Sequence, residues 1–162
     1  MSPKTLISLA AFGSAALLLG AFLFQALGYA PCQLCLWQRW PHLIAVAAGG
    51  LALLIGARFA LWAILGALGV LATAGIGLFH TGVEKMWWDG PQACSGGGSL
   101  SGLSGADLLS TEGLSDVVRC DEVAWAFLGL SMASWNALLS LGLAVLWFMA
   151  IVKSQAYRNT SA

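Results

Sequence analysis

The chain has 162 residues, of which 59% are hydrophobic and only 9% charged, and its seven basic residues balance its seven acidic ones. A soluble domain carries about 25% charged residues, and a chain this short cannot hide so much apolar surface inside a globule. The composition therefore excludes a soluble enzyme, a disordered chain and a nucleic-acid-binding protein, and it indicates an integral membrane protein.

Four long apolar segments follow one another along the chain. A helix of about 20 apolar residues crosses a bilayer, and in lipid only a helix bonds all its own backbone groups within the segment. We therefore predict an all-α membrane protein: a four-transmembrane-helix bundle with two extracytoplasmic loops, forming one domain over residues 1–162. The spans are expected at about 6–27, 40–57, 60–79 and 132–152, and the loops at about 28–39 and 80–131. A cleaved signal peptide is an alternative for the first span, but its apolar run exceeds the usual 7–15 residues.

The charges indicate which side of the membrane each loop faces. All seven acidic residues lie between positions 84 and 122, in the second long loop. The two tails and the short turn near residue 58 carry only basic residues, so the positive-inside rule places both termini in the cytoplasm. All four cysteines then lie in or beside the outer loops, where disulfides form and persist.

The first outer loop contains a Cys-x-x-Cys pair, Cys32 and Cys35, followed by Arg39. Such thiols often have a lowered pKa, and the start of the second helix would favour a thiolate at Cys35. If that helix begins at Cys35, Arg39 and His42 share its face at i+4 and i+7. Pro41 favours a later start, nearer residue 38. Headgroup anchoring is the alternative for Arg39, and for His42 we expect an interfacial position.

The second pair, Cys94 and Cys120, brackets a tract rich in glycine and serine at residues 95–105, which is typical of a flexible segment. A structural disulfide is one interpretation. An accessible bridge beside a flexible segment also exchanges readily with thiols. A zinc site is disfavoured, because Cys94 and Cys120 lie too far apart in sequence for the usual ligand spacing.

Two dithiol pairs on one face of the membrane suggest a relay. An external thiolate would attack the loop pair, and the Cys-x-x-Cys pair would reoxidise it. Electrons would leave from Cys35, and since no metal, flavin or haem motif is visible, we expect a membrane quinone to accept them. Arg39 and a histidine could stabilise the charges that develop. His80, at the outer end of the third span, lies at a suitable depth.

Polar and small residues inside the spans are interpreted as packing features. Gly69, Thr73 and Gly77 recur at helical spacing and would let a neighbouring helix approach closely. Asn136 in the fourth span is expected to form an interhelical hydrogen bond.

Three blocks of sequence together resemble one known family, the DsbB disulfide bond formation proteins. They are PCQLCLWQRWPH, HTGVEKMWWDGPQAC and CDEVAWAFLGLSMASWN, in this order between four apolar segments. The resemblance implies an enzyme of the bacterial inner membrane that reoxidises the periplasmic thioredoxin-fold oxidase DsbA and passes electrons to ubiquinone or menaquinone. No metal is implied.

The resemblance also implies roles for individual residues. Cys32 and Cys35 would be the quinone-coupled pair, with Cys35 facing the quinone, while the partner attacks Cys94 and Cys120 resolves the mixed disulfide. Three further residues match positions near the quinone: Arg39, His80 and Trp135. The sequence departs from the family in two places: Gln38 stands where some members have Glu, and the glycine tract is long. These departures bear on the geometry of partner docking more than on the chemistry.

Two other functions remain open from the sequence. One is a paralogue that serves a different thioredoxin-fold partner, and the other is a non-catalytic membrane scaffold stapled by two disulfides. Vitamin K epoxide reductases perform related chemistry, but their Cys-x-x-Cys pair follows the loop pair, whereas here it precedes it.

Overall fold

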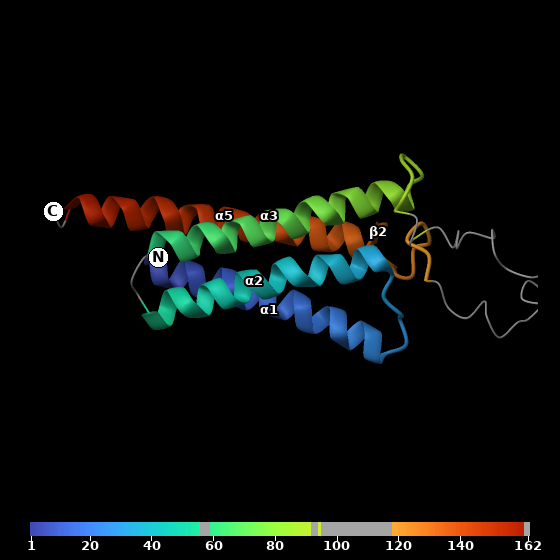
Figure 1. Ribbon diagram of the computed structural model, residues 1–162, viewed down its shortest axis with the longest axis horizontal. Coiled ribbons are helices and arrows are strands. Elements are labelled where there is room, and N and C mark those ends of the chain that lie inside the picture. Colours follow the sequence, from blue (N-terminus) through green and yellow to red (C-terminus); the bar gives the residue numbers. More distant parts are fainter. Residues whose placement is uncertain (56–58, 92–93, 95–117, 161–162) are drawn as a thin grey trace, which may run out of the picture.

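The computed structural model of the chain describes residues 1–55, 59–91, 94 and 118–160, and four long helices run lengthwise in it (Figure 1). The helices are α1 (Pro3–Ala26), α2 (Gln33–Ile55), α3 (Phe59–Glu84) and α5 (Met132–Thr160). Strands β1 (Ala126–Phe127) and β2 (Leu130–Ser131) form a two-residue antiparallel hairpin before α5. Both termini lie at the end of the bundle opposite this hairpin. The prediction of an all-helical bundle is confirmed.

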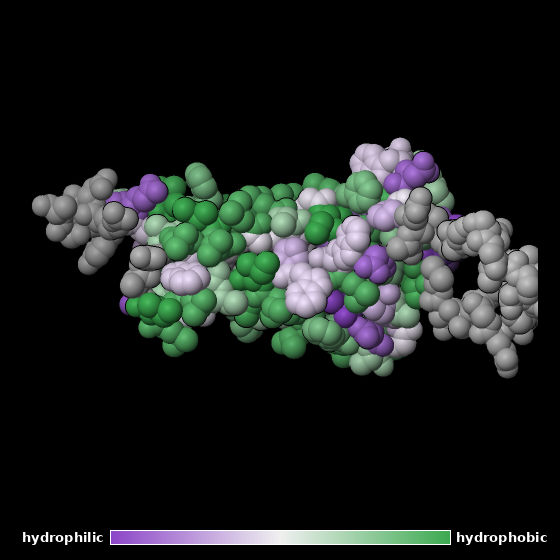
Figure 2. Space-filling model, in the orientation of Figure 1, coloured by the Kyte–Doolittle hydropathy of each residue, from purple (hydrophilic) through white to green (hydrophobic). Residues whose placement is uncertain are grey.

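Three of the four helices are long and apolar enough to cross a membrane: α1, α3 and the part of α5 from Met132 to Ala156. The described part of α2 is not among them, because its first half carries Gln38, Arg39 and His42. Figure 2 shows apolar side chains over the length of the bundle and polar ones gathered toward its ends. The prediction of four spans is therefore confirmed in part, as four helices of which three are candidate spans.

Helix α2 begins at Gln33, well before the predicted start of the second span at residue 40 and before the late start that Pro41 favoured. Cys32 caps the helix, since its carbonyl accepts a 3.1 Å hydrogen bond from the Leu36 amide. Pro41 lies inside the helix, where its ring removes one backbone hydrogen bond. Packing of the following turn against α3 offsets that loss. Helix α3 likewise extends to Glu84, so that His80 is helical.

Glycines of α3 let its backbone approach two neighbouring helices. A Cβ atom on Gly69 would lie 2.8 Å from the Pro41 carbonyl oxygen and 3.3 Å from the Ala45 nitrogen, both in α2. A Cβ atom on Gly77 would lie 3.1 Å from the Ala133 carbonyl oxygen in α5. Thr73 lies between them and donates a 3.0 Å hydrogen bond to the Gln38 carbonyl. The predicted close packing of this helix face is confirmed.

We expect Gly69→Ala to destabilise the protein. The new methyl group would overlap backbone atoms of α2 that cannot rotate away, and overpacking of this kind costs about 1–3 kcal/mol. Gly75→Ala is the matched control, because nothing lies within 4 Å of a Cβ atom there and alanine favours a helix over glycine. Unfolding by SDS in mixed micelles, followed by circular dichroism, measures both. Equal stability of the two variants would contradict the close approach.

Candidate functional site

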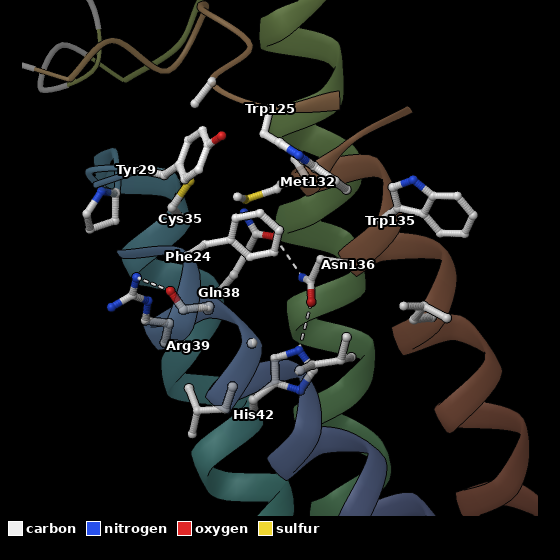
Figure 3. Close-up of a pocket in the computed structure, with 18 of the residues that line it drawn as sticks. Phe24, Tyr29, Cys35, Gln38, Arg39, His42, Trp125, Met132, Trp135 and Asn136 are labelled. Atoms are coloured by element: carbon white, nitrogen blue, oxygen red, sulfur yellow. Dashed lines mark hydrogen bonds between the residues drawn. The ribbon is translucent and has the colours of Figure 1, made fainter. Parts of the chain in front are cut away.

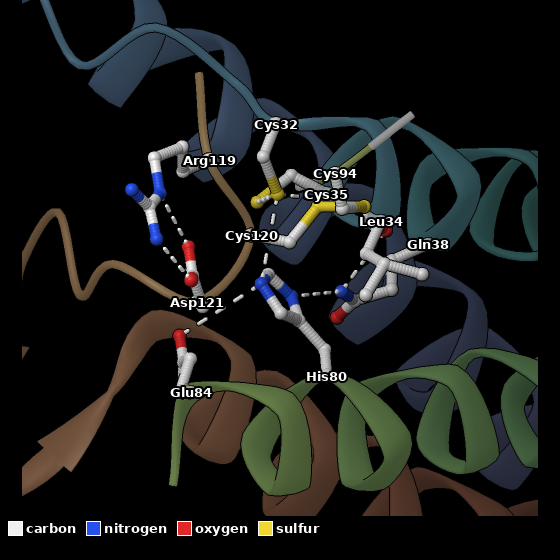
Figure 4. The surroundings of a disulfide bond; sticks show 10 residues. All are labelled: Cys32, Leu34, Cys35, Gln38, His80, Glu84, Cys94, Arg119, Cys120 and Asp121. Carbon is white, nitrogen blue, oxygen red and sulfur yellow. Dashed lines mark hydrogen bonds and ion pairs between the residues drawn. A yellow bond between two sulfur atoms is a disulfide. The ribbon is translucent and has the colours of Figure 1, made fainter. Parts of the chain in front are cut away.

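The two cysteine pairs lie together at the outer end of the bundle (Figure 4). Cys94 and Cys120 form a disulfide across 26 positions of sequence, and both are buried, so the bridge is not the accessible one considered from the sequence. Cys32 packs in the same buried cluster, together with Leu34 and Val83. Cys32 and Cys35 are free thiols, with their sulfur atoms 3.1 Å apart. The fold therefore joins the first outer loop to residues on either side of the Gly/Ser tract, a tract that itself lies outside the described residues.

The start of α2 stabilises the sulfur of Cys32 rather than that of Cys35, which corrects the prediction. The Cys35 amide donates a 3.3 Å hydrogen bond to the Cys32 sulfur, as expected of a residue that caps a helix. The Nε2 atom of His80 lies 3.5 Å from the same sulfur. The hydrogen bond with Cys35 and the contact with His80 lower the pKa of the Cys32 thiol to about 4, although burial acts to raise it.

We expect Cys32 to react as a thiolate across the neutral pH range. With a pKa of about 4, its rate of alkylation by iodoacetamide stays nearly constant between about pH 6 and pH 8, whereas an ordinary thiol slows about tenfold per pH unit below its pKa. Mass spectrometry of the reduced protein follows the Cys32 peptide alone. His80→Leu removes one stabilising contact and slows the reaction at the acidic end. A tenfold slope in the wild-type protein would show an ordinary thiol.

His80 belongs to the thiol site. Its Nδ1 atom accepts a 3.1 Å hydrogen bond from the Gln38 side chain, and its Nε2 atom lies 3.9 Å from the carboxylate of Glu84. Glu84 in turn accepts a hydrogen bond from Ser131, the residue of β2 that directly precedes α5. The sequence placed His80 beside a quinone. The structure places it against Cys32, and it is not among the described residues that line the cavity next to Cys35.

A cavity of about 450 Å³ opens beside the thiol pair, between α1, α2 and α5 (Figure 3). Most of its lining is apolar, and aromatic side chains surround its outer part: Phe24, Tyr29, Trp125, Phe127 and Trp135. The wall formed by α2 is polar, with Cys35, Gln38, Arg39 and His42 in succession. Cys35, Arg39 and His42 therefore share one face of α2, as their spacing predicted. Trp135, predicted near a quinone, also lines this cavity.

Arg39 lies along the cavity wall and does not bind a cysteine sulfur among the described residues. Its guanidinium donates a 2.7 Å hydrogen bond to Gln25 of α1 and lies 4.8 Å from the centre of the Phe22 ring. Its Nε atom is buried without a hydrogen-bond partner in the described part of the chain. Arg39 thus brings a positive charge to the cavity wall one turn along α2 from Cys35, with one buried donor that has no described partner.

His42 is a site residue that the sequence interpretation missed. Only 3% of its surface is exposed, so the interfacial position expected for it is wrong. Its Nε2 atom lies 2.9 Å from the side-chain oxygen of Asn136 in α5. The Asn136 amide nitrogen donates to Gln38 at 2.7 Å and to Thr73 at 3.0 Å, which confirms the interhelical bonding predicted for Asn136. The sequence did contain a signal for this contact, because His42 and Asn136 are polar residues at similar depths in two apolar segments.

The sulfur atoms of Cys32 and Cys35 and a ring nitrogen of His80 lie within 4.8 Å of one another. Three such atoms could ligate a metal ion. The same proximity is what thiol–disulfide exchange requires of a thiolate and its proton donor. The cluster is therefore no evidence for a metal.

Known proteins resemble this chain over most of its length. The family model for "Disulfide bond formation protein DsbB" matches residues 3–150. Proteins called disulfide bond formation protein B are similar: that of Verminephrobacter eiseniae is 35% identical over 92% of this chain and 87% of its own. That of Polaromonas naphthalenivorans is 31% identical over 83% of each chain, and that of Xanthomonas oryzae 36% identical over 76% of this chain and 74% of its own. No solved structure matches significantly.

Proposed function

The chain belongs to the DsbB family of disulfide bond formation proteins, and on that premise we propose that it reoxidises a periplasmic DsbA-like protein with a membrane quinone as electron acceptor. Family membership gives a disulfide-forming membrane oxidoreductase. The partner, the quinone (ubiquinone or menaquinone), the bacterial inner membrane and the cytoplasmic position of both termini are parts of the proposal.

One observation carries it: Cys35 belongs to two sites at once. Its sulfur lies 3.1 Å from that of Cys32, and Cys32 packs against the loop disulfide. The same residue lines the cavity between α1, α2 and α5, whose lining is mostly apolar. Cys35 is thus the point at which electrons from exchange between sulfur atoms can reach a lipid-soluble acceptor.

The proposed exchange moves two electrons inward through the two pairs. A thiolate of the reduced partner attacks Cys94, and Cys120 leaves as a thiolate. The partner's second thiol then releases Cys94, so that the partner leaves oxidised and the loop pair reduced. Once Cys32 and Cys35 have been oxidised by the acceptor to a disulfide, a loop thiolate attacks Cys32, which packs against the loop pair, and the Cys32–Cys35 bond breaks with Cys35 leaving as a thiolate. The loop disulfide re-forms and leaves Cys32 and Cys35 as thiols, the pairing described above.

The residues around the cavity fit a quinone. Its volume of about 450 Å³ suits a small ligand, its lining is mostly apolar, and the buried Nε atom of Arg39 lacks a partner. When bound, a quinone takes up the two electrons and two protons that leave when Cys32 and Cys35 form a disulfide. Arg39 orients the acceptor and stabilises negative charge near Cys35. Trp135 and Phe24 help to exclude water.

The purified protein mixed with a reduced thioredoxin-fold partner and a quinone tests the proposal. We expect the quinone absorbance to fall in step with oxidation of the partner. A non-catalytic scaffold would leave the absorbance unchanged, and that result would overturn the proposal. The partner is identified separately, by trapping a mixed disulfide at Cys94 in a Cys120→Ser variant, in which the free Cys94 thiol attacks the disulfide of the oxidised partner. Recovery of a thioredoxin-fold protein other than a general DsbA would instead support the paralogue.

A further inference from the structure

A buried polar cluster borders the cavity, and the proposed thiol exchange gives this cluster no role. It consists of His42 in α2, Asn136 in α5 and Thr73 in α3, and we call it the deep polar cluster. His42 follows Cys35 by seven residues of helix, which is about 10 Å further along α2. Only 3% of its surface is exposed, yet its Nδ1 atom has no hydrogen-bond partner among the described residues. Because polar groups buried in a membrane protein are costly, an unpaired one beside a cavity indicates a ligand.

The amide groups of this cluster fix the direction of its hydrogen bonds, whereas the Ser140 hydroxyl, 3.5 Å from Nε2 of His42, can donate or accept. The Leu34 carbonyl can only accept, so the Gln38 side chain presents its nitrogen to it at 3.1 Å and its oxygen to Asn136. Asn136 must therefore present its nitrogen to Gln38, and it also donates to Thr73, whose hydroxyl proton is engaged with the Gln38 carbonyl. The oxygen of Asn136 is left to face His42 (Figure 3).

This direction sets the tautomer of His42. Because an amide oxygen faces Nε2, that nitrogen carries the ring proton, and Nδ1 of the neutral ring carries a lone pair. None of the described carboxylates hydrogen-bonds to this ring, so we assign it the neutral form. Two of the residues that line the cavity then each have a buried nitrogen without a described partner, and the two are of opposite character: Nε of Arg39 is a donor, and Nδ1 of His42 is an acceptor.

Resting on the quinone-reducing function proposed above, we propose that His42 is a specificity-determining residue that accepts a hydrogen bond from a hydroxyl group of the reduced quinone. A quinone has two carbonyl oxygens, which accept from Arg39 but cannot donate to His42. A quinol has hydroxyl groups, which accept at Arg39 and donate at His42. The cavity therefore binds the quinol more tightly than the quinone.

Preferential binding of the quinol makes the bound pair a stronger oxidant of the thiols. For a two-electron couple, each tenfold preference for the reduced form raises the midpoint potential by about 30 mV. The thiol pair gives up two electrons and two protons to form a disulfide, and the quinone takes them up to become the quinol. His42 thus favours disulfide formation. The same hydrogen bond holds the quinol in the cavity, so release of the quinol becomes slower.

Direct binding tests this proposal without turnover. In the full-length Cys35→Ser protein, the dissociation constants of a short-tailed ubiquinone analogue and of its quinol are measured by quenching of tryptophan fluorescence under anaerobic conditions. We expect the quinol to bind about tenfold more tightly than the quinone. His42→Leu should weaken the quinol about tenfold and leave the quinone within about twofold. Asn136→Leu removes the amide oxygen that fixes the tautomer of the His42 ring, so it should reduce the preference for the quinol as well.

Leu139→Ala is the matched control, because Leu139 lines the same cavity with an apolar side chain and its loss should weaken both forms equally. If the wild-type preference is absent, or if it survives both His42→Leu and Asn136→Leu, the proposal is overturned. These outcomes leave the quinone-reducing function intact provided that the quinone still binds. Failure of both forms to bind would instead overturn the proposed function. Asn136→Leu also keeps the test available if His42→Leu does not fold.

Discussion

Cys35→Ser should abolish quinone reduction by this protein, with a loss of at least about a thousandfold, as is usual when the reacting group itself is removed. Among the described residues that line the cavity, Cys35 is the only cysteine, and its sulfur lies 3.1 Å from that of Cys32. Without it, no thiol remains among the described lining residues from which electrons can pass to an acceptor in that cavity. The absorbance of quinone, followed with the reduced partner in excess, measures the loss.

The same variant provides its own control, because the loop pair reacts with the partner before Cys35 takes part in the proposed steps. The Cys94–Cys120 disulfide is retained, so one equivalent of reduced partner should still be oxidised in a single turnover. Substantial steady-state quinone reduction by Cys35→Ser would show that electrons leave by another route. Loss of the single turnover as well would mean that the substitution disturbs the loop pair, and a milder variant would be needed to assign the role of Cys35.

The helical architecture and the grouping of the cysteines into two pairs could be predicted from the sequence, because both follow from its segments and spacing. Uninterrupted apolar segments predict helices, and the spacing of Cys35, Arg39 and His42 predicted a shared helix face, which the cavity wall confirms. The start of α2 could not be placed, because Pro41 penalises a helix by local rules. The backbone of α3, drawn close at Gly69, provides the compensating packing.

The partners of His80 and His42 depend on contacts between helices, which no local pattern contains. His80 is 48 residues from Cys32 in sequence but lies 3.5 Å from its sulfur. His42 and Asn136 are 94 residues apart and share a hydrogen bond. Each histidine alone fits an interfacial position. The packing of α2, α3 and α5 places His80 against the thiols and His42 at the cavity.

Arg39→Ala should slow quinone reduction about a hundredfold, because removal of one preorganised donor from a site of developing charge costs about that much. The Nε atom of Arg39 is buried without a partner in the described structure, while its other nitrogens are held by Gln25 and by the Ala21 carbonyl. The free donor is thus fixed in place before any acceptor binds. Arg39→Lys keeps the charge but loses this donor, so its rate should lie between those of the wild type and Arg39→Ala.

Steady-state kinetics with saturating reduced partner separate binding from chemistry for these variants. A fall in kcat with little change in KM for quinone means that Arg39 acts mainly on charge that develops during reduction, whereas a rise in KM alone means that it only holds the quinone. Arg119→Ala is the matched control, since Arg119 is exposed and pairs with Asp121 outside the cavity. If Arg39→Ala turned over quinone as fast as Arg119→Ala, the positive charge beside Cys35 would serve only to anchor α2 at the membrane surface.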